Sequence, residues 1–459
     1  MDGMILHDLL WAVGMALAGG IIFSGIGLIS GTDETSTIAP LTLLIILLGV
    51  PPVAVFSWFM AAAISKHMIH AIPTALMGVP GDTMAVPMLE DAAVLRKLGV
   101  PHMALRKMIS GGIIAAFIAL PVSVGFASLL APFADIVKAW APVVFTVAAI
   151  IIAYTSGGKW ASLFALLPFA FFIQGLNKMA IAGIGHGVFI SMFLGIAIGP
   201  MFADLMTILS PNSRHILKRD SSREFWLASE IKMWKGYFPN PIKILSKHQI
   251  MYNAMTAGVS ALTFTFSPVG MTVMMGEFVG ARIKSLYQRM TSTLAVMNGT
   301  TEATYIAETI IPLLAFGIPL SPVGLGPAAP LFNAPPVYTA QPVHNLHTFL
   351  SAADFLIYGY IGLFVAFLVA YPFSMNYARR ASAWVLKHVS QEAIISMFSG
   401  LIVVISYFEA GVVGIAIAIT IAIFGGILNR YFGVHTGVQY MVYYASPWLM
   451  ATLLGIKVR

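Results

Sequence analysis

A short stretch near residue 75 constrains the fold more than any other part of the sequence, because it interrupts a long apolar run. Residues 72–83 read Ile-Pro-Thr-Ala-Leu-Met-Gly-Val-Pro-Gly-Asp-Thr, so two prolines and two glycines fall within twelve positions. Proline removes a backbone donor and glycine permits backbone angles that other residues avoid, which predicts a broken helix. Such a break is costly in lipid, since the freed backbone groups must find partners. We therefore expect this segment to face a protein-lined interior.

The same pattern recurs in the second half of the chain. Residues 311–319 read Ile-Pro-Leu-Leu-Ala-Phe-Gly-Ile-Pro and match residues 72–80 at a constant offset of 239 (311 − 72). Two broken apolar segments at corresponding places predict the binding site of a secondary transporter. A second similarity, between residues 31–39 and 299–307, has an offset of 268 and does not fit the same ungapped repeat. We give more weight to the first match, because it preserves a backbone requirement.

The composition places the chain in a membrane. Of its 459 residues, 59% are hydrophobic and 9% are charged, whereas a soluble domain carries about 25% charged residues. The net charge of +7 is typical of basic cytoplasmic loops and is not taken here as a sign of nucleic-acid binding. The absence of cysteine excludes disulfides and thiolate metal sites. We predict a multi-pass protein of the cytoplasmic (inner) membrane.

The apolar runs predict an all-α polytopic fold with about 10–12 transmembrane helices. We expect a first membrane repeat at 1–209, a basic cytoplasmic connector at 210–249 and a second membrane repeat at 250–459. The first broken segment leads into a basic connector, but the second leads into residues 327–348, which lack Lys, Arg, Asp and Glu. This contrast favours inverted repeats over parallel ones. One observation opposes it, since the basic residues at 282–289 fit poorly if 250–275 crosses the membrane once.

Ionisable side chains next to the breaks are the candidates for chemistry. Each costs about 2.5–3.5 kcal/mol at membrane depth on insertion scales, so it persists only where a cavity or a partner accepts it. The predicted residues for ion or proton coupling are Asp33, Glu34, Asp82 and Glu302. Small and hydroxyl-bearing residues in four predicted loops (31–37, 78–83, 298–302 and 317–321) are expected to contact substrate. They are Gly31, Thr32, Thr35, Ser36, Gly78, Gly81, Thr83, Asn298, Gly299, Thr300, Thr301, Gly317 and Ser321.

Structural explanations stand beside these functional ones. Asp33 and Asp82 also fit helix N-caps, and Glu302 fits the membrane interface. His67 and His70 fit either the site or the interface. Glu90 and Asp91 are expected to be exposed and paired with Arg96 or Lys97. Glu308, in an apolar segment, is interpreted as either proton-coupled or paired with a partner that the sequence does not identify.

Signatures of ATP hydrolysis and of common enzymes are missing from the sequence. It contains no Walker A loop, no His-Glu-x-x-His and no nucleophile elbow. We therefore predict a protein that is not an enzyme, needs no cofactor and is driven by Na⁺ or H⁺. A membrane-embedded enzyme and a channel remain as alternatives.

The chain resembles a known family at several of these places. Gly78-Val-Pro-Gly-Asp-Thr83, followed by Leu89-Glu-Asp and Leu95-Arg-Lys-Leu-Gly99, resembles the large membrane subunit (TctA-like permease) of tripartite tricarboxylate transporters. Residues 298–319, 19–41 and 424–430 are similar to further parts of that subunit. The resemblance implies symport of a small organic solute, above all a carboxylate, by an elevator-like movement. It also implies a small membrane subunit and a periplasmic binding protein as partners, and we add a homodimer to the assemblies considered.

The chain departs from this family in its first loop, which reads Ser-Gly-Thr-Asp-Glu at 30–34 instead of a Pro-Gly-rich sequence. Two acids there would repel a tri-anion unless they are protonated or bound to an ion. Transport of a smaller carboxylate, an amino acid or a cation, without partner subunits, therefore stays open.

Overall fold

The computed structural model describes residues 2–30, 32–155, 158–211, 234–264, 268–339, 342–389 and 391–454. Within these ranges the regular structure is helical, apart from isolated β-bridges at residues 334–344. The first half holds α1 (Asp2–Ile26), α2 (Glu34–Leu47), α3 (Pro52–Ile72), the π-turn η1 (Pro73–Met77), the 3₁₀-helix η2 (Thr83–Met88), α4 (Leu89–Lys97), α5 (Pro101–Leu130), η3 (Ala131–Phe133), α6 (Ala134–Thr155), α7 (Trp160–Ile184) and α8 (Phe189–Leu209). The predicted all-α class is confirmed.

The second half continues with helices of very different length. They are α9 (Pro241–Ile244), α10 (Lys247–Ser260), α11 (Pro268–Gly280), α12 (Leu286–Phe316), α13 (Pro322–Leu325), α14 (Ala329–Phe332), α15 (Leu346–Phe349), α16 (Ala352–His388), α17 (Gln391–Phe432) and α18 (Thr436–Leu454). The 42-residue α17 changes direction at Ala410 and Gly411, and Gly411 has a φ of 57° that favours glycine.

The described residues contain seven helices that are long and apolar enough to cross a membrane. This confirms a polytopic membrane protein, although the number is lower than the predicted 10–12. One reason is α12, which has 31 residues but carries many buried polar side chains and is therefore not apolar enough to be counted. Another is the long helix α17, which bends where a separate helix was expected.

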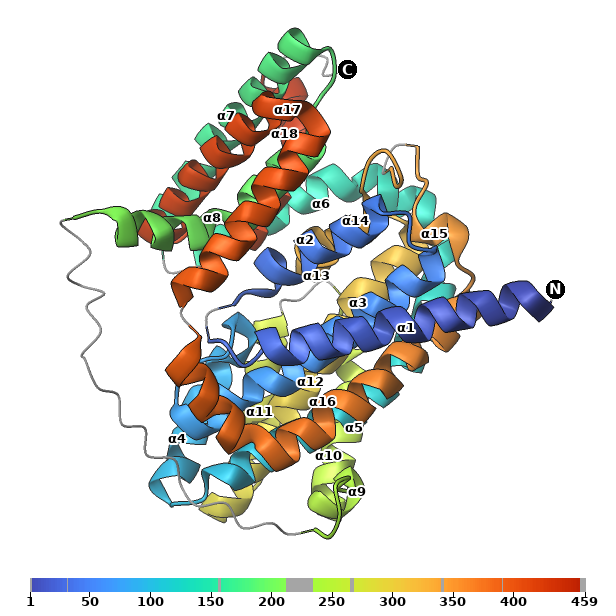
Figure 1. The fold of residues 1–459 in the computed structure, drawn as a ribbon, viewed down its shortest axis with the longest axis vertical. Helices are drawn as coiled ribbons and strands as arrows, with labels where there is room; N and C mark the ends of the chain where they lie inside the picture. Colours follow the sequence, from blue (N-terminus) through green and yellow to red (C-terminus); the bar gives the residue numbers. More distant parts are fainter. Residues whose placement is uncertain are drawn as a thin grey trace.

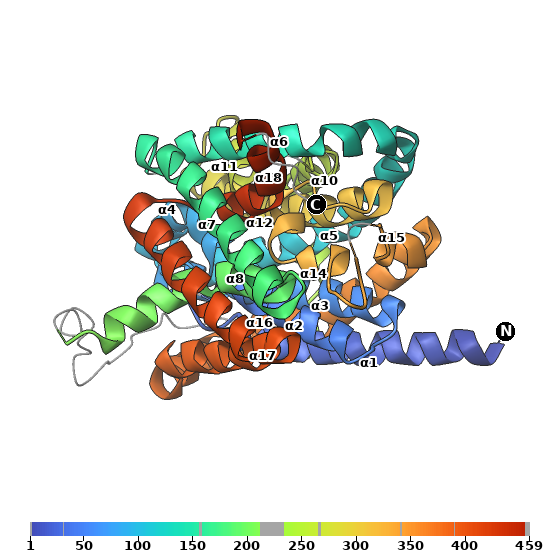
Figure 2. The ribbon, with the colours of Figure 1, turned by 90° about the horizontal axis from the view of Figure 1, so that it is seen from above.

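The long helices other than α6 form two groups (Figure 1), and α6 itself contacts α18 and α7. The site group consists of α1, α3, α5, α10, α11, α12 and α16, and the outer group consists of α7, α8, α17 and α18. In the site group α3 packs against α1 and α16, and α12 packs against α5, α10 and α11. In the outer group α17 packs against α8, as Figure 2 shows, and α18 packs against α7. The short helix α2 contacts both groups, through α3 on one side and α8 and α17 on the other.

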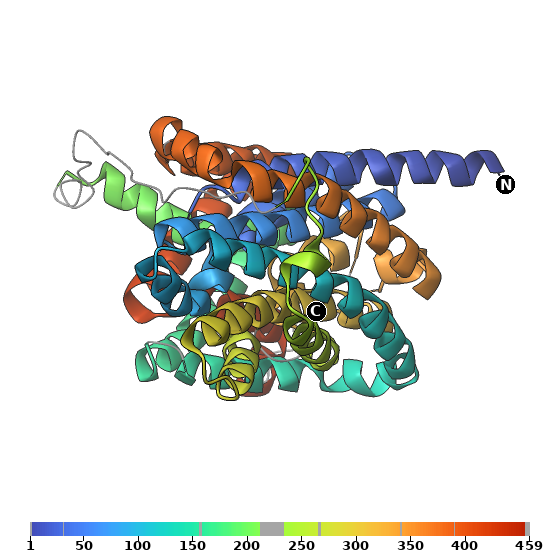
Figure 3. The same cartoon turned by 90° about the horizontal axis from the view of Figure 1, so that it is seen from below.

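Each group contains helices from both halves of the chain. The N-terminal α1 and the much later α16 run side by side along one edge in Figure 3, and α10 and α11 lie at the opposite edge. Close packing of α5 on α12 depends on Gly111, because a Cβ there would clash with the backbone of Ala295. The predicted boundaries at 209 and 249 and the inversion of the repeats stay predictions.

Two local expectations were wrong. Residues 250–275, predicted as one span, form part of α10 and α11, which have 14 and 13 residues and are each shorter than the roughly 20 needed to cross. The objection raised by the basic residues at 282–289 assumed that 250–275 crosses once, and that assumption is wrong. Residues 298–302, predicted as a loop, lie inside α12, where their polar groups meet buried partners.

Candidate functional site

The first break in the apolar sequence is closed by hydrogen bonds to its own neighbours. The helix α3 ends at Ile72 and continues as η1, after which Gly78 adopts a φ of 75° and donates its N–H to the carbonyl of Pro73 at 3.0 Å. Arg96 of α4 donates to the carbonyl of Thr74 at 2.7 Å, so a cation satisfies one of the carbonyls left free at the helix end. Next, the Asp82 carboxylate accepts the N–H of Ala85 and caps η2.

The second break repeats this geometry at the same offset. Gly317 has a φ of 67° and donates its N–H to the carbonyl of Pro312 at 2.9 Å, as Gly78 does to Pro73. Ser321 accepts the N–H of Gly324 at 2.9 Å and caps α13, as Asp82 caps η2, 239 positions earlier (321 − 82). The repeat seen in the sequence therefore corresponds to equivalent backbone structure. The capping side chains differ, however, because Asp82 is an acid and Ser321 is uncharged.

Three ionisable side chains project from α3 just before its break. Lys66, His67 and His70 lie on one side of the helix, as the spacing i, i+1 and i+4 requires, and all three are fully buried. The ammonium of Lys66 donates to Asp82 at 3.2 Å and to Glu34, in the first turn of α2, at 3.4 Å. It also donates to the carbonyl of Thr32 at 2.7 Å.

The two histidines connect this ion pair to α12. Nδ1 of His70 lies 2.7 Å from the Asp82 carboxylate, and its Nε2 lies 3.3 Å from the Asn298 side-chain oxygen. Nδ1 of His67 lies 3.1 Å from Glu302, and its Nε2 lies 3.6 Å from Glu34. We call Glu34, Lys66, His67, His70, Asp82, Asn298 and Glu302 the charged cluster. It brings together α2, α3, the first break and the middle of α12.

The charged cluster has an adjustable net charge. It holds three carboxyl groups and one ammonium, together with two histidines that are each close to a carboxylate. Buried charges of this kind are tolerated only when they are paired and hydrogen-bonded. With three ionised carboxylates the net charge is −2 when both histidines are neutral and zero when both are protonated.

The charged cluster is poorly suited to a metal ion, because Lys66 would compete with the ion for its ligands. Glu34, His70 and Asp82 offer ligand atoms that all lie within 4.8 Å of one another. The ammonium of Lys66, however, already contacts two of these three side chains. A second cation would therefore compete with a fixed positive charge for the same oxygens.

Only some of the residues predicted around the first loop contact the charged cluster. Asp33 caps α2 by accepting the N–H of Thr35 at 3.0 Å, and the hydroxyl of Thr83 lies 3.5 Å from its carboxylate. Thr32 contributes its carbonyl to Lys66, and its hydroxyl donates to the carbonyl of Ile29 at 2.9 Å. Ser36 is buried and donates to the carbonyl of Asp33, so its hydroxyl is used within the turn. Gly31 lies outside the described residues.

Glycines at the site pack so closely against backbone or side-chain atoms that a Cβ would meet them. A Cβ on Gly81 would lie 2.5 Å from the carbonyl oxygen of His70, so Gly81 holds the first break tightly against α3. Gly78 lies against Arg96, and Gly317 lies against Val343 and His347. A Cβ on Gly326 would lie 3.0 Å from the hydroxyl of Thr35, one of the residues predicted to contact substrate.

The predicted residues of α12 and the second break have different surroundings. Gly299 faces Asn253 of α10, and the Thr301 hydroxyl lies 2.8 Å from that of Thr272 in α11, so both point away from the charged cluster. The Thr300 hydroxyl is buried without a hydrogen-bond partner among the described residues. The Ser321 hydroxyl donates to the carbonyl of Glu308 at 2.6 Å.

The sequence interpretation underestimated Lys66, His67 and His70. Histidines in a largely apolar helix often lie at the membrane interface, and no single-residue signal distinguished these two. The informative signal was their spacing, since three ionisable residues on one helix face immediately precede a break that carries an acid. Glu308, which had no assigned partner, accepts the N–H of Val323 at 3.0 Å. Glu409 accepts the N–H groups of Ile190 and Ser191 and so caps α8.

Comparison with known proteins now adds to this geometry. The family model described as "Tripartite tricarboxylate transporter TctA family" matches residues 13–436, a region that contains both breaks and the whole charged cluster. The chain belongs to the TctA family. The resemblance proposed from the sequence is thereby confirmed, and this TctA-family chain is a multi-pass membrane protein of a transporter family whose members are the large subunits of tripartite systems. No curated protein and no solved structure matched the chain.

Proposed function

We propose that this TctA-family protein is a secondary transporter that couples uptake of a small carboxylate to H⁺ across the cytoplasmic membrane. The family membership supports transport. The observation that carries the proposal further is the charged cluster, which joins the first break to the middle of α12 and so connects both halves of the chain. In secondary transporters, sites of this kind bind substrate and coupling ion near the centre of the membrane.

The chemistry of the charged cluster favours H⁺ over Na⁺. Sodium is bound by oxygen ligands without a competing cation, yet Lys66 contacts both Glu34 and Asp82. Histidine is the side chain whose ordinary titration lies closest to neutral pH, and both cluster histidines lie beside carboxylates. Protonation would remove negative charge from the site and so allow an anionic substrate to approach.

The sequence-based objection to an anionic substrate is weakened by this arrangement. Glu34 was expected to repel a carboxylate, but its oxygen lies 3.4 Å from the ammonium of Lys66. Polar atoms remain for substrate in the part of the chain that the structure describes: the Tyr305 hydroxyl is buried without a hydrogen-bond partner, and so is Oε1 of Glu302, which could donate to a carboxylate only when protonated. Nε2 of His67 has its nearest acid, Glu34, at 3.6 Å. The side chains of His67, Glu302 and Tyr305 are neighbours, since the His67 ring lies against Tyr305 and its Nδ1 is within hydrogen-bond distance of Glu302.

Access to the charged cluster requires movement. Its side chains are at most 4% exposed, so a solute reaches them only after elements have separated. We propose that the site group and the outer group move relative to each other in an elevator-like manner, with α2 between them. A small membrane subunit and a periplasmic binding protein would deliver the substrate, and a homodimer would provide a fixed frame.

Uptake into proteoliposomes tests this function. The chain, reconstituted with a small membrane subunit and a periplasmic binding protein of a tripartite system, should accumulate labelled citrate or a mono- or dicarboxylate when the outside is acidic. Accumulation should stop when a protonophore collapses the gradient, and it should persist when K⁺ replaces Na⁺. Uptake that needs Na⁺ and ignores the pH gradient would overturn H⁺ coupling, whereas an absence of uptake under every condition would overturn transport.

Two histidine variants make the test specific. His67→Gln removes a titratable group of the charged cluster, and we expect citrate uptake to fall at least about tenfold, as for the loss of a general acid–base group. His186→Gln changes an exposed histidine in the α7–α8 turn and serves as the matched control. Equal uptake by the two variants would remove His67 from the coupling mechanism.

A further inference from the structure

The threonines of α12 fall into two sets that differ in how their hydroxyls are used. In one set each hydroxyl donates to the carbonyl four residues earlier, at 2.8–3.0 Å, and these residues are Thr291, Thr301 and Thr309. In the other set the hydroxyls are buried and have no hydrogen-bond partner among the described residues, and these are Thr293, Thr300 and Thr304. A buried polar group without a partner is uncommon and needs an explanation.

Two threonines of the second set lie on the same face of α12 as an acid. Thr300, Thr304 and Glu308 are spaced by four positions, so their side chains follow one another along about 12 Å of the helix. Asn298 and Glu302 of the charged cluster come two positions before Thr300 and Thr304, which places them about 200° around the helix. We call Thr300, Thr304 and Glu308 the polar stripe, and it is separate from the charged cluster.

The acid of the polar stripe has no counterion. Glu308 is fully buried, and its Oε2 accepts the N–H of Val323 at 3.0 Å. Its Oε1 has no hydrogen-bond partner in the described part of the chain. Within that part no charged side chain acts on the carboxyl group either, so the paired role that the sequence left open for Glu308 is not found there.

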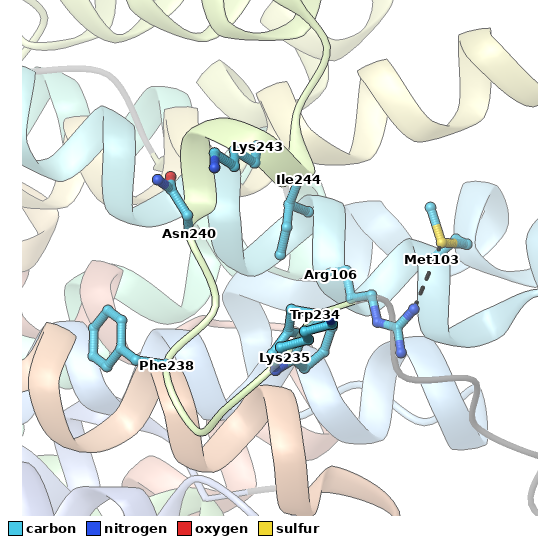
Figure 4. Close-up of a pocket in the computed structure, with 8 residues that line it drawn as sticks. All are labelled: Met103, Arg106, Trp234, Lys235, Phe238, Asn240, Lys243 and Ile244. Carbon is cyan, nitrogen blue, oxygen red and sulfur yellow. Dashed lines mark hydrogen bonds between the residues drawn. The ribbon is translucent and has the colours of Figure 1, made fainter.

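Other buried charges of the chain differ from Glu308 in this respect. The guanidinium of Arg106, drawn in Figure 4, lies 4.8 Å from the centre of the Trp234 ring, and the ammonium of Lys66 contacts two carboxylates. An ionised carboxylate that is buried without a cation is strongly disfavoured. The carboxyl group of Glu308 is therefore expected to be neutral in this state, with its proton on Oε1.

Ionisable groups near the polar stripe have other contacts. Glu302 and Tyr305 both lie against His67, and His347 of α15 contacts the backbone carbonyl of a residue in α12. The buried acid therefore has none of these groups to exchange its proton with directly. The unpartnered hydroxyl of Thr304 lies one helical turn before it, within the reach of a bridging water molecule.

We propose that Glu308 carries a second coupling proton, and that Thr304 and Thr300 line the route by which this proton exchanges with water. The inference rests on the H⁺ coupling proposed above. The O–H bond of Glu308 breaks, the proton passes to a water molecule held by the Thr304 hydroxyl, and the carboxylate keeps the N–H of Val323. Because these atoms are enclosed, water reaches them only when the helices around α12 separate. The charged cluster and the polar stripe then provide one proton site beside each break.

Infrared difference spectroscopy of the full chain in nanodiscs tests the protonation of Glu308 without any uptake. The wild type should show a carboxylic-acid C=O band at neutral pH that is missing from Glu308→Gln. This variant should keep the wild-type melting temperature, because glutamine has the shape of the neutral acid. In D₂O the band should shift as the proton exchanges. The absence of the band from the wild type would show that Glu308 is ionised and would overturn the proposal.

Two valine variants test the route. Thr304→Val removes an unpartnered hydroxyl and should slow the exchange of the Glu308 band at least about tenfold, as for the loss of a proton-transfer group. Thr309→Val removes a hydroxyl that donates within its own helix and lies next to Glu308 in the sequence, and it should leave the exchange rate unchanged. Equal exchange rates in the two variants would overturn the route.

The number of protons moved with each citrate tests the coupling. In proteoliposomes with a pH indicator inside, Glu308→Gln should lower the ratio of protons to labelled citrate by about one. The wild-type ratio in this variant would overturn the second coupling proton. Uptake driven by Na⁺ instead of H⁺ would overturn the proposed function, and the infrared experiments distinguish that failure because they need no uptake.

Discussion

At the residue scale, Asp82 has two structural roles. Its carboxylate caps η2 through the N–H of Ala85, and it accepts charge-assisted hydrogen bonds from Lys66 while contacting His70. Each role gives a buried donor, the Ala85 N–H or the Lys66 ammonium, a hydrogen-bond acceptor. The N-cap proposed as an alternative to a functional role is therefore present together with the contacts of the charged cluster, and the two explanations do not exclude each other.

Neutralising Asp82 should destabilise the protein. Asp82→Asn leaves the buried ammonium of Lys66 with a single carboxylate contact, and removing one partner of a buried pair costs about 3–5 kcal/mol. We expect a clearly lower melting temperature in detergent and no citrate uptake. The double variant Lys66→Met with Asp82→Asn should regain most of the stability but not the uptake. Full stability of the single variant would show that Lys66 is not held by this pair.

Asp91, in α4 outside the membrane-spanning helices, gives the protein a pH dependence of its own. Burial raises the pKa of Asp91 to about 6, assisted by the nearby Glu277 and Glu90 and opposed by Arg289. Because the pKa of Asp91 is higher in the folded state than in the unfolded chain, its contribution to stability is greatest below about pH 4. That contribution is lost as the pH rises through about 6.

Asp91→Asn should therefore stabilise the protein at pH 7, by about 1 kcal/mol once the partial exposure of the side chain is taken into account. Thermal unfolding of the wild type should show falling stability between pH 4 and pH 6, and the variant should show a flatter profile. Asp135→Asn, at an exposed position in α6 that is not among the groups acting on Asp91, is the control. A variant with the same pH profile as the wild type would contradict this account.

At the element scale, two of the three glycines in helix α5 have opposite surroundings. A Cβ on Gly111 would clash with the backbone of Ala295 in α12, whereas a Cβ on Gly125 would have nothing within 4 Å. Close approach of small residues is a common way for membrane helices to pack. Gly111 therefore determines how near α5 comes to α12 and to the charged cluster.

The two glycines form a matched pair of substitutions. Gly111→Ala should lower stability by about 1–3 kcal/mol through overpacking and should reduce uptake, because α12 carries Asn298 and Glu302. Gly125→Ala should leave uptake unchanged and raise stability by up to about 1 kcal/mol through helix propensity. Fluorescence-detected melting of both variants gives the comparison, and equal effects of the two substitutions would show that the α5–α12 contact is less tight than described.

The broken helices could be predicted from sequence because proline and glycine impose backbone requirements that act locally. The polar run at 298–302 could not be interpreted in the same way. In isolation Asn-Gly-Thr-Thr-Glu is typical of a loop, but in the structure Asn298 donates to the carbonyl of Met108 in α5 and Glu302 contacts His67 in α3. Their partners lie 190 and 235 residues away, so only the tertiary structure shows why the helix continues.

At the scale of the whole molecule, the two helix groups should move relative to each other during transport. The chain contains no cysteine, so spin labels can be introduced without background. Labels at the exposed positions Leu368 in α16 and Val404 in α17 should report distances that shift by several ångströms when citrate is added at acidic pH. Double electron–electron resonance measures this shift.

A label pair inside one group provides the comparison for that experiment. Leu368 and Ile21 are exposed positions on α16 and α1, which pack together within the site group. Their distance should stay constant when citrate is added. If both pairs shift equally, or neither shifts under conditions that support uptake, the division into two moving groups is wrong.

The polar character of α12 also has a consequence for how the protein is made. A helix that carries Asn298, Glu302 and Glu308 in its buried interior is a poor substrate for insertion into lipid on its own. Its polar groups are accepted by α3, α5 and the second break, and the first two of these are synthesised much earlier. We expect α12 to be held at the translocon or the membrane surface until those helices receive it, so that biogenesis of the second half depends on completion of the first.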